Sequence, residues 1–176
     1  AIYPRWSLVH YRLGAIYLYD LKQPEQASSY YRNALALKNN YPSASFGLAE
    51  AFDKLGYTDS SIKYYTLTDQ LEPGHFGSLN KLAMLWYMNG DSVRAFNYND
   101  KFLVLYPEEE LPNLNAGNFY LFSKDTSTAI PYFEKVIAIN PLNPNLSAFL
   151  SSYFRKRGES EKHLYYNKLA NANPRN

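Results

Sequence analysis

Histidine is the residue type of this chain best suited to metal binding or to proton transfer near neutral pH, and it occurs at three positions. His10, His75 and His163 lie far apart in the sequence. A protein zinc site usually takes ligands from closely spaced pairs such as His-x3-His, or from cysteine, which this chain lacks. The spacing therefore argues against a zinc site, and the sequence predicts no metal centre.

Glu108, Glu109 and Glu110 form the densest group of carboxylates in the chain. Such a group suggests a metal or partner site, or else negative charge that stabilises the N-terminus of a following helix. Adjacent side chains point in different directions, so the three carboxylates do not converge on one ion. We therefore expect them to begin a helix.

Motifs of the common catalytic sites are absent from the sequence. It contains no glycine-rich phosphate loop, no nucleophile elbow and no paired-carboxylate motif. Asn145-Leu146-Ser147 matches a glycosylation sequon, but the match is short and lies on a predicted helix. The sequence predicts a protein that is not an enzyme and needs no cofactor.

Composition restricts the remaining classes of function. The 176 residues are 46% apolar and 19% charged, with a net charge of +2. Balanced charge argues against nucleic-acid binding. No apolar run is long enough for a membrane-spanning helix. A chain rich in tyrosine and free of cysteine is associated with bacterial envelope or periplasmic proteins, although a cytoplasmic location also fits this composition.

The sequence repeats itself every 34 residues. Steps of this length meet one tyrosine each time, at Tyr30, Tyr64, Tyr98, Tyr132 and Tyr166. Prolines follow the same period at Pro73, Pro107 and Pro141, glycines at Gly56 and Gly90, and small residues at Ala27, Ser61, Ala95 and Ala129. A fixed period of this length is the signature of a repeat architecture in which stacked units share one core.

Each repeat predicts two helices. In the second repeat, apolar residues from Phe46 to Phe52 follow helical spacing, Gly56 ends that helix, and Thr58 begins a second one that Pro73 stops. We place the repeats at residues 8–41, 42–75, 76–109, 110–143 and 144–176. The tyrosines are expected to pack between helices rather than to stack against a ligand.

This pattern resembles the tetratricopeptide repeat family, over nearly the whole chain. The first helices match through Leu48-Ala49 with Phe52, Leu82-Ala83 with Trp86, and Ala116-Gly117 with Tyr120. The second helices match through Ser61, Tyr65 and Thr68, through Ala95, Asn99 and Phe102, and through Ala129, Phe133 and Val136. The first repeat departs at Lys22 and Asn39, and the fifth at His163, Asn167 and Arg175. The resemblance implies an all-α, right-handed solenoid of stacked antiparallel helix hairpins.

Three segments need separate expectations. Residues 1–7 are interpreted as the tail of an upstream element or as a lead-in. Pro131 falls inside the predicted second helix of the fourth repeat, so we expect that helix to start late, with Thr126 or Thr128 as its cap; the alternative is a kinked helix that starts on schedule. The polar stretch 159–173 is expected to cap the solenoid.

The resemblance also implies a concave groove lined by the first helix of each hairpin. Its candidate residues here are Tyr19, Phe46, Asn80, Met84, Tyr87, Met88, Leu114, Asn118, Leu121, Phe122, Arg155 and Lys156. The residues with which chaperone-binding members grip a terminal carboxylate are absent, since Ile16, Glu50 and Met84 occupy the corresponding positions. The apolar middle of the groove either binds a guest peptide or is used in packing between hairpins.

The sequence therefore favours a non-catalytic scaffold that binds a peptide or protein segment in the groove. One alternative is an auxiliary repeat region of a larger envelope or glycan-assembly enzyme. The other is glycan binding by the exposed aromatic rings of Trp86, Tyr87 and Tyr120, for which the exposure of these rings is the deciding observation.

Overall fold

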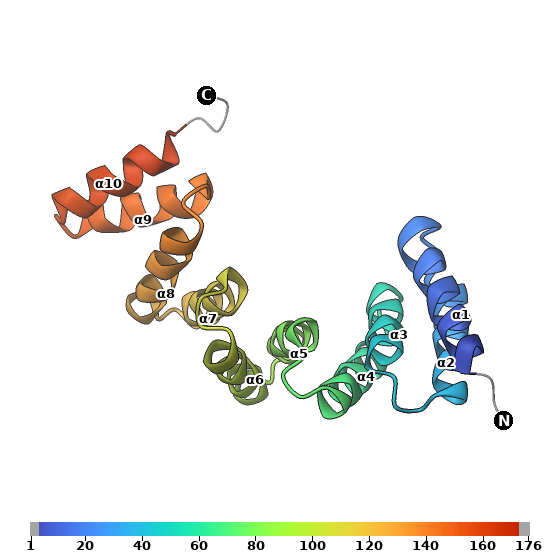
Figure 1. Cartoon of the computed structure of the whole chain (residues 1–176). Coiled ribbons are helices and arrows are strands. Elements are labelled where there is room, and N and C mark those ends of the chain that lie inside the picture. The colour runs from blue at the N-terminus through green and yellow to red at the C-terminus, as the bar shows by residue number, and fades with distance from the viewer. Residues whose placement is uncertain (1–3, 173–176) are drawn as a thin grey trace. The chain divides into compact units, whose positions relative to one another are not determined.

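The computed structural model describes residues 4–172, and over that range it contains helices and no strand (Figure 1). The helices form five consecutive pairs, which confirms the predicted all-α solenoid of hairpins. The first pair is α1 (Pro4–Ala15), continued by the π-helix η1 (Ile16–Asp20), with α2 (Pro24–Leu37). The other pairs are α3 (Pro42–Lys54) with α4 (Thr58–Leu71), α5 (Phe76–Met88) with α6 (Ser92–Leu105), α7 (Glu110–Phe122) with α8 (Thr126–Ile139), and α9 (Pro144–Lys156) with α10 (Ser160–Ala170).

The chain divides between Lys101 and Phe102 into two compact units, which are described separately. In the first unit, α1 packs on α2, α2 on α3, α3 on α4, and α4 on α5. In the second unit, α7 packs on α8, α8 on α9, and α9 on α10. Each hairpin thus buries its apolar faces partly against its neighbour, as a repeat array requires.

Buried aromatic rings fill the space between helices where glycine leaves room. Tyr31 of α2 is fully buried between Gly14 of α1 and Gly47 of α3. A Cβ atom on Gly14 would lie only 2.8 Å from the Tyr31 ring, which is closer than real Cβ atoms come. Phe133 of α8 packs in the same way against Gly117 of α7. These glycines are therefore required for the close approach of the rings.

The periodic tyrosines pack inside their own hairpins. Four of them stack on an aromatic ring of the first helix, with ring centroids 5.0–5.8 Å apart: Tyr30 on Tyr17, Tyr64 on Phe52, Tyr132 on Tyr120, and Tyr166 on Phe154. In the third hairpin, Tyr98 and Trp86 pack against one core cluster that residues of the second and third hairpins form together. Tyr166 is buried, whereas the other four are half-buried. The structure thus supports packing as the role of this ladder of rings.

The turn inside each hairpin places one residue in the left-handed region of φ. The positions are 34 residues apart, with φ between 56° and 82°, at Lys22, Gly56, Gly90, Lys124 and Gly158. Glycine takes this conformation without steric cost, whereas lysine does not. The departure from the family pattern at Lys22 therefore changes the residue but not the backbone.

The first hairpin has one residue more than the others between the stacking ring of its first helix and the turn. The Gln23 amide donates to the Tyr17 carbonyl at 2.8 Å, whereas in the second hairpin the Tyr57 amide donates to Phe52, one residue less distant in sequence. The π-helix η1 accommodates this extra residue. Because of it, Tyr17 rather than Leu18 occupies the stacking position of Phe52.

The predicted late start of α8 is wrong. The helix begins at Thr126, one period after Ser92 of α6, and Pro131 lies inside it. Neither threonine is its cap, because Asp125 holds that position and accepts a hydrogen bond from the Thr128 amide at 3.1 Å. Burial of Ala129, Ile130 and Phe133 on one side of α8 explains why the helix forms despite the proline.

Two further expectations concern chain segments near helix starts. Helix α1 begins at Pro4, so part of the proposed lead-in 1–7 is helical, while residues 1–3 lie outside the described residues. Glu109 is the cap residue of α7 and Glu110 is its first residue, as expected for acids that begin a helix. Glu108 lies before this helix and pairs with Lys135 of α8 at 3.2 Å.

Candidate functional site

The candidate site is the face that the first helices of the hairpins present to solvent, here called the first-helix face. In the first unit it belongs to α1, α3 and α5, and in the second unit to α7 and α9. The groove residues predicted from the sequence lie on these helices or on η1, the continuation of α1. Their exposure differs from residue to residue.

In the first unit, the methionines of α5 are open to solvent. Met84 is 42% exposed and Met88 is 78% exposed. Tyr87 and Asn80 on the same helix are half-buried. Phe46 of α3 is also half-buried, because its ring packs against those of Tyr65 and His75, with centroids 5.5 and 4.8 Å away.

In the second unit, the predicted residues divide into packed and exposed groups. Leu114 and Leu121 pack against the buried cluster of the last two hairpins, and Asn118 is half-buried. Phe122 at the end of α7 is 68% exposed. Arg155 and Lys156 at the end of α9 are exposed. Packing therefore accounts for the two leucines but leaves most of the Phe122 surface in solvent.

Two polar contacts join successive first helices of the first unit, and the sequence did not reveal them. The Tyr19 hydroxyl of η1 donates a hydrogen bond to the Glu50 carboxylate of α3. Lys81 of α5 forms an ion pair with Asp53 of α3, with Nζ and Oδ2 2.9 Å apart. Both carboxylates could be placed on the first-helix face from the period alone, but their partners follow only from the packing of neighbouring hairpins.

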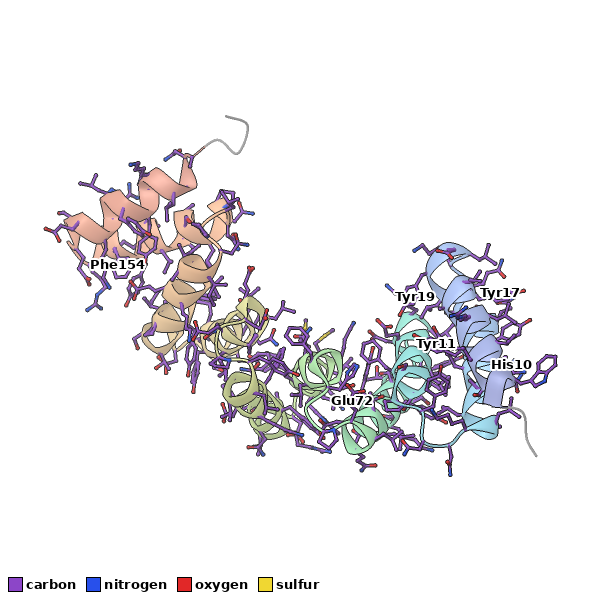
Figure 2. The ribbon with its side chains drawn as sticks, in the orientation of Figure 1. His10, Tyr11, Tyr17, Tyr19, Glu72 and Phe154 are labelled. Atoms are coloured by element: carbon purple, nitrogen blue, oxygen red, sulfur yellow. The ribbon has the colours of Figure 1, made fainter. Side chains whose placement is uncertain are left out.

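Tyrosine side chains surround these carboxylates. Figure 2 shows Tyr11 and Tyr19 on the side of the first helix that faces α3, and Tyr17 and His10 on the other side. Burial, together with the hydrogen bond and the negative charge of Glu50, raises the pKa of Tyr19 above its ordinary value. Burial and the charges of Asp53 and Glu50 raise the pKa of Tyr65 in the same way. Both hydroxyls therefore stay protonated at physiological pH.

A pocket of about 500 Å³ opens beside Glu50. Its walls come from both the first and the second hairpin and combine apolar, aromatic and charged groups. The lining residues are Leu18, Tyr19, Lys22, Pro24, Glu50 and Lys54.

The histidines stay apart in the structure. His75 caps α5 by accepting a hydrogen bond from the Ser78 amide at 3.1 Å, so it does not have the plain surface role expected from the sequence. The Nδ1 atom of His163 lies 2.9 Å from the Ser151 hydroxyl. Within residues 4–172, no three acidic, histidine or cysteine side chains gather where they could hold a metal ion. None of the helices described is long and apolar enough to cross a membrane.

The aromatic rings considered for glycan stacking are partly covered. The Arg94 guanidinium lies 3.5 Å from the centroid of the Trp86 ring, and Tyr120 stacks on Tyr132. Tyr87 is half-buried. One ring face of Trp86 and one of Tyr120 are therefore already in contact with protein.

Comparison with known proteins supports the repeat assignment. The family model described as "Tetratricopeptide repeat" matches residues 8–41 and 113–141. No curated protein matches the chain. Among solved structures, PilF of Pseudomonas aeruginosa superposes with a TM-score of 0.77 at 23% identity, covering 94% of this chain and 75% of PilF.

Two further solved structures have the same fold. A tetratricopeptide repeat protein of Thermus thermophilus has a TM-score of 0.64 at 18% identity, with 93% of this chain and 89% of that protein covered. MamA of Desulfovibrio magneticus RS-1 has a TM-score of 0.75 at 14% identity, with 93% and 90% covered. The tetratricopeptide repeat model thus matches two segments of the chain, and the solved structures show the same fold of helical repeats over most of its length.

Proposed function

We propose that the chain is a non-catalytic scaffold that binds a segment of another protein on its first-helix face. The observation that carries the proposal is the exposure of large apolar side chains at the positions that the family uses for binding. Met88 and Phe122 expose 78% and 68% of their surface in the first and second units. This exposed apolar surface can bury against a guest.

The chemistry of these side chains fits a guest with apolar anchors. Methionine adapts its shape to different partners, and an aromatic ring supplies a large apolar contact. Asn80 and Asn118 are half-buried beside them and can hydrogen-bond a peptide backbone. Arg155 and Lys156 add exposed positive charge in the second unit, which raises the association rate of a guest with acidic residues.

The proposal is tested by selecting peptides from a random display library against the whole chain. Binding of a selected peptide is then measured by fluorescence anisotropy for Met88→Ser and Phe122→Ser. Each substitution is expected to weaken binding by about 1–3 kcal/mol if the side chain is an anchor. The melting temperature should change little because both side chains are exposed.

Matched controls separate this face from apolar surface in general. Val93 is 71% exposed on the second helix α6, and Leu142 is 72% exposed between α8 and α9. Val93→Ser and Leu142→Ser should leave peptide affinity unchanged. Equal losses in the controls and in the anchor variants would contradict the proposal, as would a library that yields no binding peptide.

A further inference from the structure

Helix α1 carries a stripe of apolar residues that is open to solvent. The residues are spaced by three or four positions and so share one side of the helix: Trp6, Val9, Leu13 and Ile16, the last of which begins η1. Trp6 is 56% exposed, and Val9 and Ile16 are each 43% exposed. We call this stripe the outer side of α1. An apolar stripe on a helix normally marks the side that packs against another element.

Ring contacts show which residues of the second hairpin correspond to those of α1. Tyr11 packs against Tyr31 of the following second helix, with ring centroids 6.0 Å apart. One hairpin later, Phe46 packs against Tyr65 in the same way, at 5.5 Å. Tyr11 and Phe46 are 35 residues apart, because the extra residue of the first hairpin lies after Tyr11. A step of 35 therefore relates the residues of α1 to those of α3.

The corresponding positions of α3 form the interface with the preceding hairpin. Steps of 35 from the outer side of α1 reach residues that are fully buried in a cluster shared with α2: Val9 corresponds to Ala44, Leu13 to Leu48, and Ile16 to Ala51. The outer side of α1 thus occupies the positions of an interface between hairpins, but no second helix precedes it among the described residues.

Helix α10 exposes the other half of the same interface. Leu164 of α10 is 64% exposed, whereas steps of 34 lead back from it to two buried residues, Ile130 of α8 and Ile62 of α4. Ile62 shares a buried cluster with Leu82 and Leu85 of α5, and Ile130 shares one with residues of α9. The cap expected from the polar stretch 159–173 is therefore incomplete at the position where α4 and α8 pack on the next first helix.

The two exposed halves correspond to each other residue by residue. Leu82 and Leu85 lie one step of 34 and one step of 35 after Leu13 and Ile16. If α1 of one copy packed on α10 of another as α5 packs on α4, Leu164 would therefore meet Leu13 and Ile16.

A second pair of positions compensates in size. Within the array, the Tyr31 ring fills the space that Gly47 leaves. The same positions hold Asn167 on α10 and Arg12 on α1, and both of these side chains are exposed. A short side chain on α10 would thus face a long one on α1. The amide oxygen of Asn167 accepts from Asn171 at 3.2 Å and keeps a lone pair for the Arg12 guanidinium.

We propose that copies of this chain associate end to end, with the outer side of α1 of one copy packed on α10 of the next. The contact repeats the packing of a second helix on the next first helix within the array. It joins two different surfaces, so each copy can bind two others. Pairing of two α1 helices would instead leave Leu164 exposed and bring two Arg12 cations into one interface. The inference concerns a surface other than the first-helix face and goes beyond the proposed function.

The first experiment is sedimentation velocity on the whole chain over a range of concentrations. Reversible association with a dissociation constant of about 10–100 μM is expected, because a contact between two helices is a small interface. A chain that stays monomeric up to about 1 mM would overturn the inference. In that case, loss of a selected peptide with Ile16→Lys would assign the outer side of α1 to a guest helix.

Single substitutions locate the two halves of the contact. Ile16→Lys and Leu164→Lys each place a charge in the proposed interface, so each should raise the dissociation constant at least about tenfold. The melting temperature should change little, because both side chains are exposed. If Ile16→Lys unfolds the chain, Val9→Lys tests the same surface. Val93→Lys adds the same charge at a residue of α6 that is 71% exposed, and it should leave association unchanged. Equal loss with Val93→Lys would contradict the inference.

A mixture of the two variants tests the end-to-end geometry. The Ile16→Lys variant keeps an intact α10, and the Leu164→Lys variant keeps an intact outer side of α1. Neither should associate alone, whereas the mixture should form a one-to-one heterodimer and no larger species. Association of the Leu164→Lys variant by itself would show that two α1 helices pair, and would refute the proposed contact. A mixture that stays monomeric would refute it as well.

Discussion

The turn inside each hairpin allows a stability prediction of opposite sign at two equivalent positions. Lys124 and Gly90 both occupy the left-handed region, with φ of 64° and 82°. An L-residue in this region is strained by about 1–2 kcal/mol, because its Cβ approaches the backbone. Lys124→Gly removes that strain, while Gly90→Ala introduces it.

The size of each effect follows from the backbone alone. Glycine has more freedom in the unfolded chain, which offsets about 0.5–1 kcal/mol of the relieved strain. Lys124→Gly is therefore expected to raise the free energy of unfolding by about 0.5–1 kcal/mol. A Cβ on Gly90 would have no heavy atom within 4 Å, so packing adds nothing to the change. Gly90→Ala should lower the free energy of unfolding by about 1 kcal/mol.

Urea unfolding followed by circular dichroism measures both changes, and an unchanged m-value shows that the same surface unfolds. Lys124→Ala is the control, because it removes the charge and keeps the Cβ. It should not reproduce the gain seen with glycine. The reasoning is refuted if Lys124→Gly is no more stable than Lys124→Ala, or if Gly90→Ala leaves stability unchanged.

Two further predictions concern α8. Pro131→Ala restores an amide that can donate to the Ser127 carbonyl, so urea unfolding should show the free energy of unfolding raised by about 2 kcal/mol, which is the cost of proline inside a helix less its effect on the unfolded chain. A lower free energy of unfolding would show that the exposed ring of Pro131 contributes packing that outweighs the hydrogen bond. Hydrogen bonds from Thr128 and Ser127 lower the pKa of Asp125 in the folded protein. The charged carboxylate therefore stabilises the fold fully above the pKa that Asp125 has in the unfolded chain, and this stabilisation is lost as the pH falls through the pKa of the folded state. Melting curves should therefore show Asp125→Ala less stable than the parent at pH 7 and nearly equal to it near pH 2, and a pH-independent difference would exclude the charged cap as the cause.

The sequence allowed the fold to be predicted because its signals recur in every repeat. The five tyrosines, the turn glycines and the prolines each fix one position of a 34-residue unit. A single repeat would have been ambiguous, since Lys22 and Lys124 do not suggest a left-handed residue. The period supplies that information, because the other turn positions hold glycine.

Two features of the structure could not be read from this period. The start of α8 was misplaced because a local rule for proline was applied without the burial of Ala129, Ile130 and Phe133, which stabilises the helix. The extra residue of the first hairpin was missed because a step of 34 from Phe52 reaches Leu18, which is also apolar and buried. The pattern of apolar residues is thus the same with or without the π-helix.

The π-helix connects the fold with the candidate site. Tyr17 holds the position that stacks on the periodic tyrosine, and the residues after it form the wide π-helical turn, which is followed by the left-handed residue Lys22. Leu18 points into the core, and Tyr19 reaches Glu50 on the next first helix. In the second hairpin no extra residue is present, and the residue after Phe52 is Asp53, which pairs with Lys81. Tyr19 lies 34 residues before Asp53, so at this position a tyrosine hydroxyl of the first hairpin, and a carboxylate of the second, contacts the next first helix.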